Sequence, residues 1–205
     1  ITVSAHGGST LGGRPVWFDM DVKRINYDRQ GDYLGEFMGD DRVLVILDNY
    51  DYYITTFDEN NHYEDNVMRV EKYDPQKIWT LVMKDSETDA YNLKRSLLDA
   101  KPAKQNMLGE PKRFSMNLLT DTQYPRFRFT FGKLDEFREP LEIDADEFIP
   151  IRSVATKGKK VSNYYIEKIE EIEPSKVPEQ EKSENEETTN EEISDTNNID
   201  SDSLF

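Results

Sequence analysis

The stretch VLVIL-DNYD-YYITTF, from Val43 to Phe57, reads as an apolar strand, a polar turn and a second strand. The pattern returns three times, with incoming strands WTLVM, FSMNLL and IPIRSVA and outgoing strands AYNLKRSLL, RFRFTF and SNYYIEKI. The turns are spaced by 37, 36 and 36 residues and begin at Asp48, Asp85, Asp121 and Lys157. A lone hairpin cannot bury its apolar face, so this period predicts one unit that repeats and packs on its neighbours. The pattern therefore predicts an all-β, propeller-like ring of roughly four to six hairpin blades.

The chain on either side of these hairpins differs in composition. Residues 1–13, ITVSAHGGSTLGG, are small and glycine-rich and predict a loop, and strand-like segments (PVWFDM, VKRINYD and YLGEF) begin after it. Residues 174–205 hold ten acids and two lysines, so this segment carries −8 of the net charge of −16. It cannot bury enough apolar area to offset the entropy of ordering, and we expect it to be disordered. The predicted organisation is a loop over 1–13, a folded β domain over 14–173 and an acidic tail over 174–205.

Composition also limits the class of protein. The chain has no cysteine, which excludes disulfides and thiolate metal sites and fits a reducing cytoplasm. Its longest apolar run, Val43–Leu47, is too short to span a bilayer, and the basic start and apolar stretch of a secretory signal are missing. We therefore expect a cytoplasmic chain with no membrane partner. Because the chain begins at Ile1, we also expect a fragment of a longer protein or a processed chain.

Few residues support a catalytic or ligand site. Residues 58–65, DENNHYED, alternate oxygen ligands but lack the central glycine and the final glutamate of a calcium loop. His6 and His62 are the only histidines, so we do not expect a zinc site. After the glycine-rich run Gly7–Gly13, Arg14 and Pro15 stand where a phosphate loop needs Lys followed by Ser or Thr. We expect no catalytic residue, no metal and no cofactor in this chain.

Basic residues gather in three groups, which are opposed by few acids. The groups are Lys94, Arg95, Lys101, Lys104, Lys112 and Arg113; Arg152, Lys157, Lys159, Lys160 and Lys168; and Arg126 with Arg128 on one face of RFRFTF. Such groups bind phosphates without sequence preference, although an ordinary solvated surface carries the same residues. Because the groups lie at equivalent hairpin positions, they would line one rim of the ring. The predicted phosphate contacts are Lys94, Arg95, Lys112, Arg113, Arg126, Arg128, Lys157, Lys159 and Lys160.

Acidic residues are segregated as well. Residues 40–65 hold eight acids against Arg42, and residues 133–147 hold seven against Lys133 and Arg138. Faces of opposite sign suit a module that touches DNA on one side, and acidic loops that only confer solubility explain the pattern equally well. An alternative function is a propeller-like protein–protein interaction module that docks its partner with these acidic faces and the tail.

Several stretches resemble a known family. They are STLGGR (Ser9–Arg14), WFD (Trp17–Asp19), LGEFMGDDRVLVI (Leu34–Ile46) and VATKGKKVS (Val154–Ser162). In order and spacing they resemble the C-terminal domain of bacterial DNA topoisomerase IV A, of the Bacteroides type, within the gyrase A and topoisomerase IV A family. The gyrase box Gln-Arg-Arg-Gly-Gly-Lys-Gly is missing, and its nearest fragment is Thr156–Lys160. The resemblance therefore favours topoisomerase IV over gyrase.

The resemblance implies a fold and a function. It implies a β-pinwheel, in which neighbouring blades exchange strands and the outer rim binds and bends duplex DNA. The parent would be an ATP-hydrolysing type II topoisomerase, whose catalytic tyrosine and sites for ATP and Mg lie outside this chain. The domain would position DNA for strand passage and decatenation. Its partners would be duplex DNA, the core of topoisomerase IV A and the companion protein topoisomerase IV B, in the cytoplasm at the nucleoid.

Overall fold

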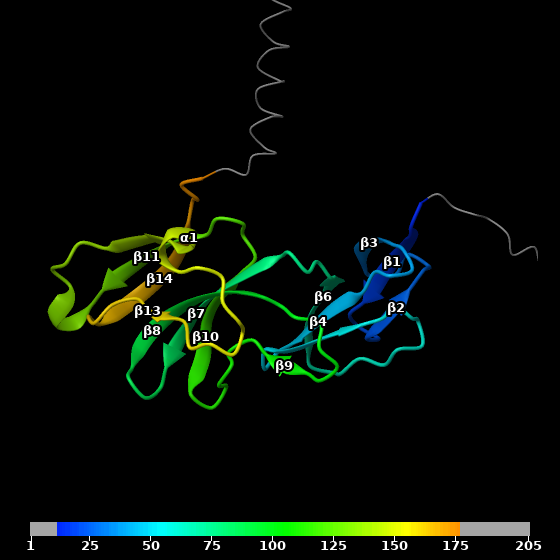
Figure 1. Ribbon diagram of the computed structural model, residues 1–205, viewed down its shortest axis with the longest axis horizontal. Coiled ribbons are helices and arrows are strands. Elements are labelled where there is room, and N and C mark those ends of the chain that lie inside the picture. The colour runs from blue at the N-terminus through cyan, green and yellow to red at the C-terminus, as the bar shows by residue number, and fades with distance from the viewer. Residues whose placement is uncertain (1–11, 177–205) are drawn as a thin grey trace, which may run out of the picture.

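The computed structural model describes residues 12–176, which form four small antiparallel sheets in a row (Figure 1). The described helices are short: α1 (Ala145–Phe148) and the 3₁₀ turn η1 (Lys133–Asp135). The expected β class is therefore confirmed. Most of the predicted loop over 1–13 and of the predicted acidic tail lies outside the described residues, so both remain predictions.

Sheets 1 and 2 occupy the N-terminal half of the row. Sheet 1 has the order β2-β1-β3, with β1 (Arg14–Asp19), β2 (Arg24–Asn26) and β3 (Asp32–Phe37). Sheet 2 has the order β6-β4-β5-β9, with β4 (Val43–Leu47), β5 (Asp51–Thr55), β6 (Val67–Lys72) and β9 (Gln105–Asn106).

Sheets 3 and 4 complete the row. Sheet 3 has the order β10-β7-β8-β13, with β7 (Ile78–Asp85), β8 (Ala90–Leu97), β10 (Phe114–Thr120) and β13 (Lys159–Lys160). Sheet 4 has the order β12-β11-β14, with β11 (Arg126–Phe131), β12 (Leu141–Asp144) and β14 (Ile166–Ile172).

The first two predicted hairpins are confirmed. Strand β4 pairs with β5, with Ile46 opposite Tyr52, and β7 pairs with β8, with Val82 opposite Leu93. Strand β4 is buried at every position because it is covered on both faces, as its unbroken apolar sequence predicts. Its Leu44 and Ile46 enter one core and its other residues enter another.

The two later hairpins were predicted wrongly. FSMNLL, which is β10, pairs with β7 in sheet 3, whereas RFRFTF, which is β11, pairs with β12 and β14 in sheet 4. Residues 149–158 form no strand at all. The physical reason is that alternation identifies a strand and its apolar face but does not identify the strand that pairs with it. Phe114 packs between sheets 2 and 3, and Phe127 packs between sheets 3 and 4, so their strands belong to different sheets.

Each sheet shares a hydrophobic core with the next one in the row. Phe18 and Phe37 of sheet 1 pack with Val45 of sheet 2, and Ile46 of sheet 2 packs with Trp79 of sheet 3. Val82 and Leu93 of sheet 3 pack with the phenylalanines of β11. This stacking explains why a single hairpin of the repeat would not be stable alone.

Within residues 12–176 the row stays open, and the expected closed ring is not formed. None of the three cores joins sheet 4 to sheet 1. The outward face of sheet 4 carries charged side chains at cross-strand positions: Arg126, Arg128, Glu142, Lys168 and Glu170. Such a face gains nothing from burial against sheet 1, because burying charges is costly.

Neighbouring sheets exchange strands, as the resemblance implied. Strand β9 lies between β8 and β10 in the sequence, yet it pairs with β5 of sheet 2. Strand β13 lies between β12 and β14, yet it pairs with β8 of sheet 3. The chain therefore reaches back by one sheet each time and ties consecutive sheets together.

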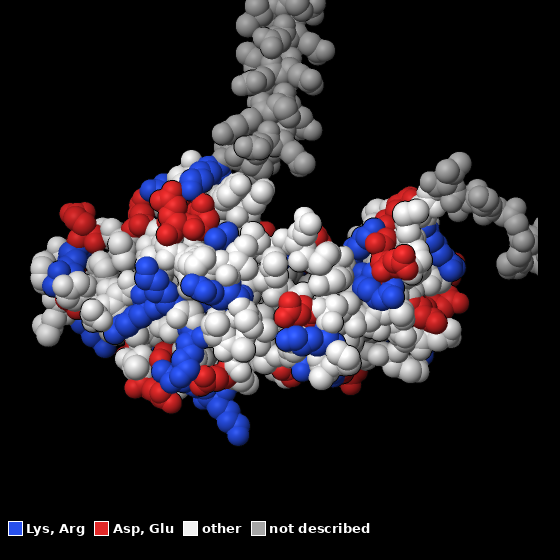
Figure 2. Space-filling model, in the orientation of Figure 1, with Lys and Arg blue, Asp and Glu red and all other residues white. Residues whose placement is uncertain are grey.

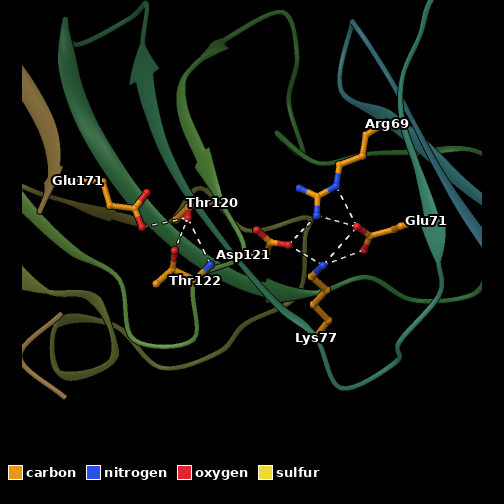
Figure 3. Close-up of polar contacts among 7 residues, drawn as sticks. All are labelled: Arg69, Glu71, Lys77, Thr120, Asp121, Thr122 and Glu171. Atoms are coloured by element: carbon orange, nitrogen blue, oxygen red, sulfur yellow. Dashed lines mark hydrogen bonds and ion pairs between the residues drawn. The ribbon is translucent and has the colours of Figure 1, made fainter. Parts of the chain in front are cut away.

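A polar network also joins the sheets (Figure 3). Arg69 of β6 forms ion pairs of 2.6 Å with both Glu71 and Asp121, and Lys77 pairs with the same two carboxylates. Thr120, which directly precedes Asp121, donates its hydroxyl to the carboxylate of Glu171 in sheet 4 over 3.0 Å. Partial burial would raise the pKa of Asp121, but the hydrogen bonds from Lys77 and Arg69 outweigh it and lower the pKa. The carboxylate thus stays charged and links sheets 2 and 3.

Candidate nucleic-acid interface

The candidate interface is the basic segment, defined as residues 149–160. It contains four basic residues and no acid: Arg152, Lys157, Lys159 and Lys160. It runs from the end of α1, which follows β12 of sheet 4, to β13 at the edge of sheet 3. Strand β13 pairs with Asn92 and Leu93 of β8. An irregular segment needs partners for its backbone groups, and here β8 supplies several of them.

Side chains of β8 fix this segment by binding its carbonyl oxygens. The Lys94 Nζ donates to the carbonyls of Val154 (2.7 Å) and Thr156 (3.2 Å). Asn92 donates its Nδ2 to the Lys157 carbonyl over 2.9 Å. The basic segment is therefore pinned to sheet 3 at consecutive points along its length.

Lys94 was predicted as a phosphate contact, and the structure corrects this. Its side chain is 0 % exposed because β8 lies inside sheet 3 with neighbours on both faces. Burial lowers the pKa of Lys94 to about 8. An ammonium group in this position satisfies carbonyls of the chain and cannot reach DNA.

Arg95 is corrected for the same reason. It is 6 % exposed, and its guanidinium donates to the carbonyl of Ile149 over 3.3 Å. Its own carbonyl accepts the N–H of Arg152 over 2.8 Å. Arg95 therefore positions the start of the basic segment from inside the fold.

Gly158 lets the basic segment approach β8 closely. Its φ is +72°, and a Cβ on this residue would lie 2.6 Å from the carbonyl oxygen of Leu93. Only glycine adopts such a backbone without strain and without a clash. The two lysines that follow are thereby held at the sheet edge.

The basic side chains of this segment point outward, and all four residues are exposed. Within the described chain, Arg152 and Lys160 form no ion pair. The Nζ of Lys157 forms a long ion pair with the carboxylate of Glu110, over 3.6 Å. The Lys159 Nζ donates to the Phe148 carbonyl over 3.2 Å and lies 4.1 Å from the centre of that ring. These charges are exposed and largely unneutralised, so they can contact an external anion.

Comparison with known proteins assigns the chain to a family. The family model described as topoisomerase C-terminal domain, Bacteroidota, matches residues 24–173. The chain belongs to this family. The searches of curated proteins and of solved structures found no match to the chain.

Other predicted contacts of this topoisomerase C-terminal domain are neutralised by carboxylates. Arg113 donates to both oxygens of Asp85, over 3.0 and 2.7 Å, and pairs with Glu87. Arg126 and Arg128 both bind Glu142, over 2.6 and 2.8 Å. A cation that already holds a carboxylate has less to gain from a phosphate.

Lys112 differs from these arginines. It is exposed, makes no ion pair in the part of the chain that the structure describes, and lines a shallow surface cavity with Glu87 and Glu110. It lies outside the basic segment and next to acids, so it is not counted among the proposed contacts.

The predicted continuous basic rim is not present on the face that Figure 2 shows. Lys and Arg side chains gather there over sheets 3 and 4, with acids at the margins, and the two signs are mixed over sheets 1 and 2. The acids of residues 133–147 are also partly neutralised, since Arg138 binds Asp135 and Lys176 binds Asp146 and Glu147. On this face the domain presents one basic area rather than a belt.

Sequence reasoning left Arg152 and Asn92 out of the predicted site. Arg152 could have been found, because it lies in the same acid-free stretch as the three predicted lysines. Asn92 left no signal, because its role depends on the position of a carbonyl 65 residues away.

Two other findings concern alternative sites. Residues 12–176 contain no group of three or more His, Asp or Glu side chains placed to hold a metal ion. No helix among them has the length and apolar character needed to cross a membrane.

Proposed function

We propose that this topoisomerase C-terminal domain binds duplex DNA through the basic segment. The phosphate contacts are Arg152, Lys157, Lys159 and Lys160. Three residues of β8 position them through hydrogen bonds to carbonyl oxygens of the basic segment: Asn92, Lys94 and Arg95. The observation that carries the proposal is an outward-facing group of four basic residues on a segment that contains no acid and is held against a sheet. Phosphate contacts of this kind give affinity without sequence specificity.

We infer a finer assignment from the same residues. The missing gyrase box and the Thr156–Lys160 fragment support topoisomerase IV A over gyrase A. The domain then acts without catalytic residues of its own. It holds a duplex beside the core of topoisomerase IV A during ATP-dependent strand passage and decatenation with topoisomerase IV B, in the cytoplasm at the nucleoid.

The test compares two double variants with equal loss of charge. Lys159→Gln with Lys160→Gln removes two proposed contacts, and Arg126→Gln with Arg128→Gln removes two cations already held by Glu142. The affinity of each full chain for random-sequence duplex DNA is measured across a salt series. Removing two phosphate contacts reduces the slope of log K against log salt by about 1.8.

The two variants separate a local site from a general effect of charge. The lysine variant is expected to lose affinity and slope, and the arginine variant to keep most of both. Equal losses would show that net charge alone matters, and binding that does not depend on salt in the unmodified chain would refute the proposal.

A further inference from the structure

The repeat leaves one position of sheet 4 empty. Sheets 2, 3 and 4 are built alike. The first strand of each sheet in the sequence is β4, β7 or β11, and it pairs with the next strand along the chain, which is β5, β8 or β12 respectively. The outer edge of β5 is covered by β9, and that of β8 by β13. Within residues 12–176 no strand pairs with the outer edge of β12. An uncovered edge presents unpaired backbone groups to any extended segment.

The two strands that fill the equivalent positions share one geometry. Each is two residues long and is followed by an apolar residue whose N–H donates back across the pair. Met107 donates to the Tyr50 carbonyl and Val161 to the Tyr91 carbonyl, each over 2.9 Å. Both apolar side chains are buried between two sheets. The position thus requires a short extended stretch and one apolar anchor.

A cavity lies where such an anchor would enter sheet 4. It measures about 480 Å³, adjoins the start of β12 at Pro140 and Leu141, and is lined by Phe131, Phe137 and Tyr164. Phe137 is 75 % exposed, and Leu134 in the same loop is 91 % exposed. Exposed apolar side chains grouped beside a cavity mark a surface that binds a partner.

The loop around this cavity is already ordered for binding. The Arg138 guanidinium lies 3.5 Å from the centre of the Tyr164 ring and donates to Asp135 over 2.9 Å. Asp135 also accepts the N–H of Tyr165, over 3.3 Å. Because the side chains are held before binding, little conformational entropy is lost when a partner docks.

Charge decides which segment fits this edge. Arg138 and Glu139 both line the cavity, and Asp135 neutralises Arg138. Glu139 is exposed and has no ion-pair partner within the described chain. Residues 177–205 of this chain are strongly acidic and would be repelled. A basic segment is attracted, and the chain shows the type: β13 and the residue after it read Lys159-Lys160-Val161.

We propose that the open edge of β12 and the adjoining cavity bind an extended, basic segment of a partner protein by strand addition. The segment carries Lys or Arg residues followed by an aliphatic residue. Its backbone pairs with β12, its aliphatic side chain enters the cavity beside Phe131 and Tyr164, and its cations face Glu139. Main-chain bonds supply affinity and the pocket supplies specificity in this mode of recognition. The site shares no residue with the proposed DNA contacts, and the proposal does not depend on them.

The test uses a fluorescent peptide with the sequence of residues 156–163, TKGKKVSN, and the full chain. One control peptide has the three lysines replaced by glutamate, and another has a methyl group on the backbone nitrogen of its valine. The methylated peptide keeps every charge but loses the N–H that donates across the strand pair, so it separates strand addition from general attraction to an acidic protein. Both controls are expected to bind at least about tenfold more weakly than the parent peptide.

Two variants of the chain locate the binding surface. Glu139→Lys is expected to weaken the parent peptide severalfold, whereas Glu136→Lys, in the same loop but outside the cavity lining, is expected to change it little. Hydrogen exchange is expected to slow at residues 141–144 when the parent peptide is added. Equal binding of the methylated peptide would overturn the proposal. So would full protection of the outer β12 amides without any peptide, because another part of the chain would then fill the edge.

Discussion

The ammonium group of Lys94 lies 2.7 Å from the carbonyl oxygen of Val154, which is 60 residues further along the chain. Through this bond a buried residue of β8 determines where the exposed lysines after Val154 lie. A residue predicted to contact DNA instead positions the residues that we propose to do so. This bond and the ion pair between Arg113 and Asp85 should determine how the domain responds to substitution and to pH.

Replacing Lys94 with methionine should destabilise the domain. The substitution leaves the Val154 and Thr156 carbonyls without their buried donor, at a cost of about 1–3 kcal/mol. Urea unfolding measures the change in the free energy of unfolding. Lys112→Met is the matched control, because Lys112 is exposed, and it should stay within about 0.5 kcal/mol. Equal effects of the two substitutions would contradict the role given to Lys94.

Stability should rise with pH above about 8 in a way that depends on Lys94. Burial lowers the pKa of this group in the folded state to about 8, whereas the unfolded chain keeps its proton up to about 10.4. In this window the unfolded state binds more protons, so raising the pH favours the folded state. The neutral amine still has two hydrogens for the two carbonyls. Urea midpoints at several pH values should show this gain in the unmodified chain and its loss in Lys94→Met.

Gly158→Ala should disturb both stability and DNA binding. The added Cβ would lie 2.6 Å from the Leu93 carbonyl oxygen, and alanine disfavours a φ of +72°. We expect a loss of about 1–3 kcal/mol and weaker binding to duplex DNA, since Lys159 and Lys160 follow directly. Gly39→Ala is the control, because nothing lies within 4 Å of its added Cβ. A Gly158→Ala chain with unchanged unfolding and unchanged DNA affinity would show that the close approach to β8 is unimportant.

Acid should weaken the domain partly through Asp85. Hydrogen bonds from Arg113 lower the pKa of this carboxyl group to about 2. A lowered pKa means that the contribution is complete above the unfolded value of about 3.9 and is lost as the pH falls towards 2. Asp85→Asn should therefore be less stable at neutral pH, and the difference from the unmodified chain should shrink below about pH 4. A difference that stays constant down to pH 2 would mean that this ionisation does not contribute.

Local sequence was sufficient to predict β4, β5, β7, β8, β10 and β11 as strands, although it also predicted a strand over residues 149–155 that does not form. The unbroken apolar run of β4 indicated a strand covered on both faces, and the alternation in β11 placed Phe127 and Phe129 inward and Arg128 outward. These properties depend on the two-residue period of a strand, which the sequence displays directly. The short polar turns likewise predicted the β4–β5 and β7–β8 hairpins.

Beyond these two hairpins, tertiary structure alone decided which strands pair, whether the row closes, and which cations reach solvent. Lys94 and Arg128 both lie on strands rich in basic residues, yet Lys94 is buried and Arg128 holds a carboxylate of the next strand. Burial depends on whether a second sheet covers a given face, and ion pairing depends on which strand lies alongside. Both are set by contacts between residues far apart in the chain, and a periodic pattern carries no information about them.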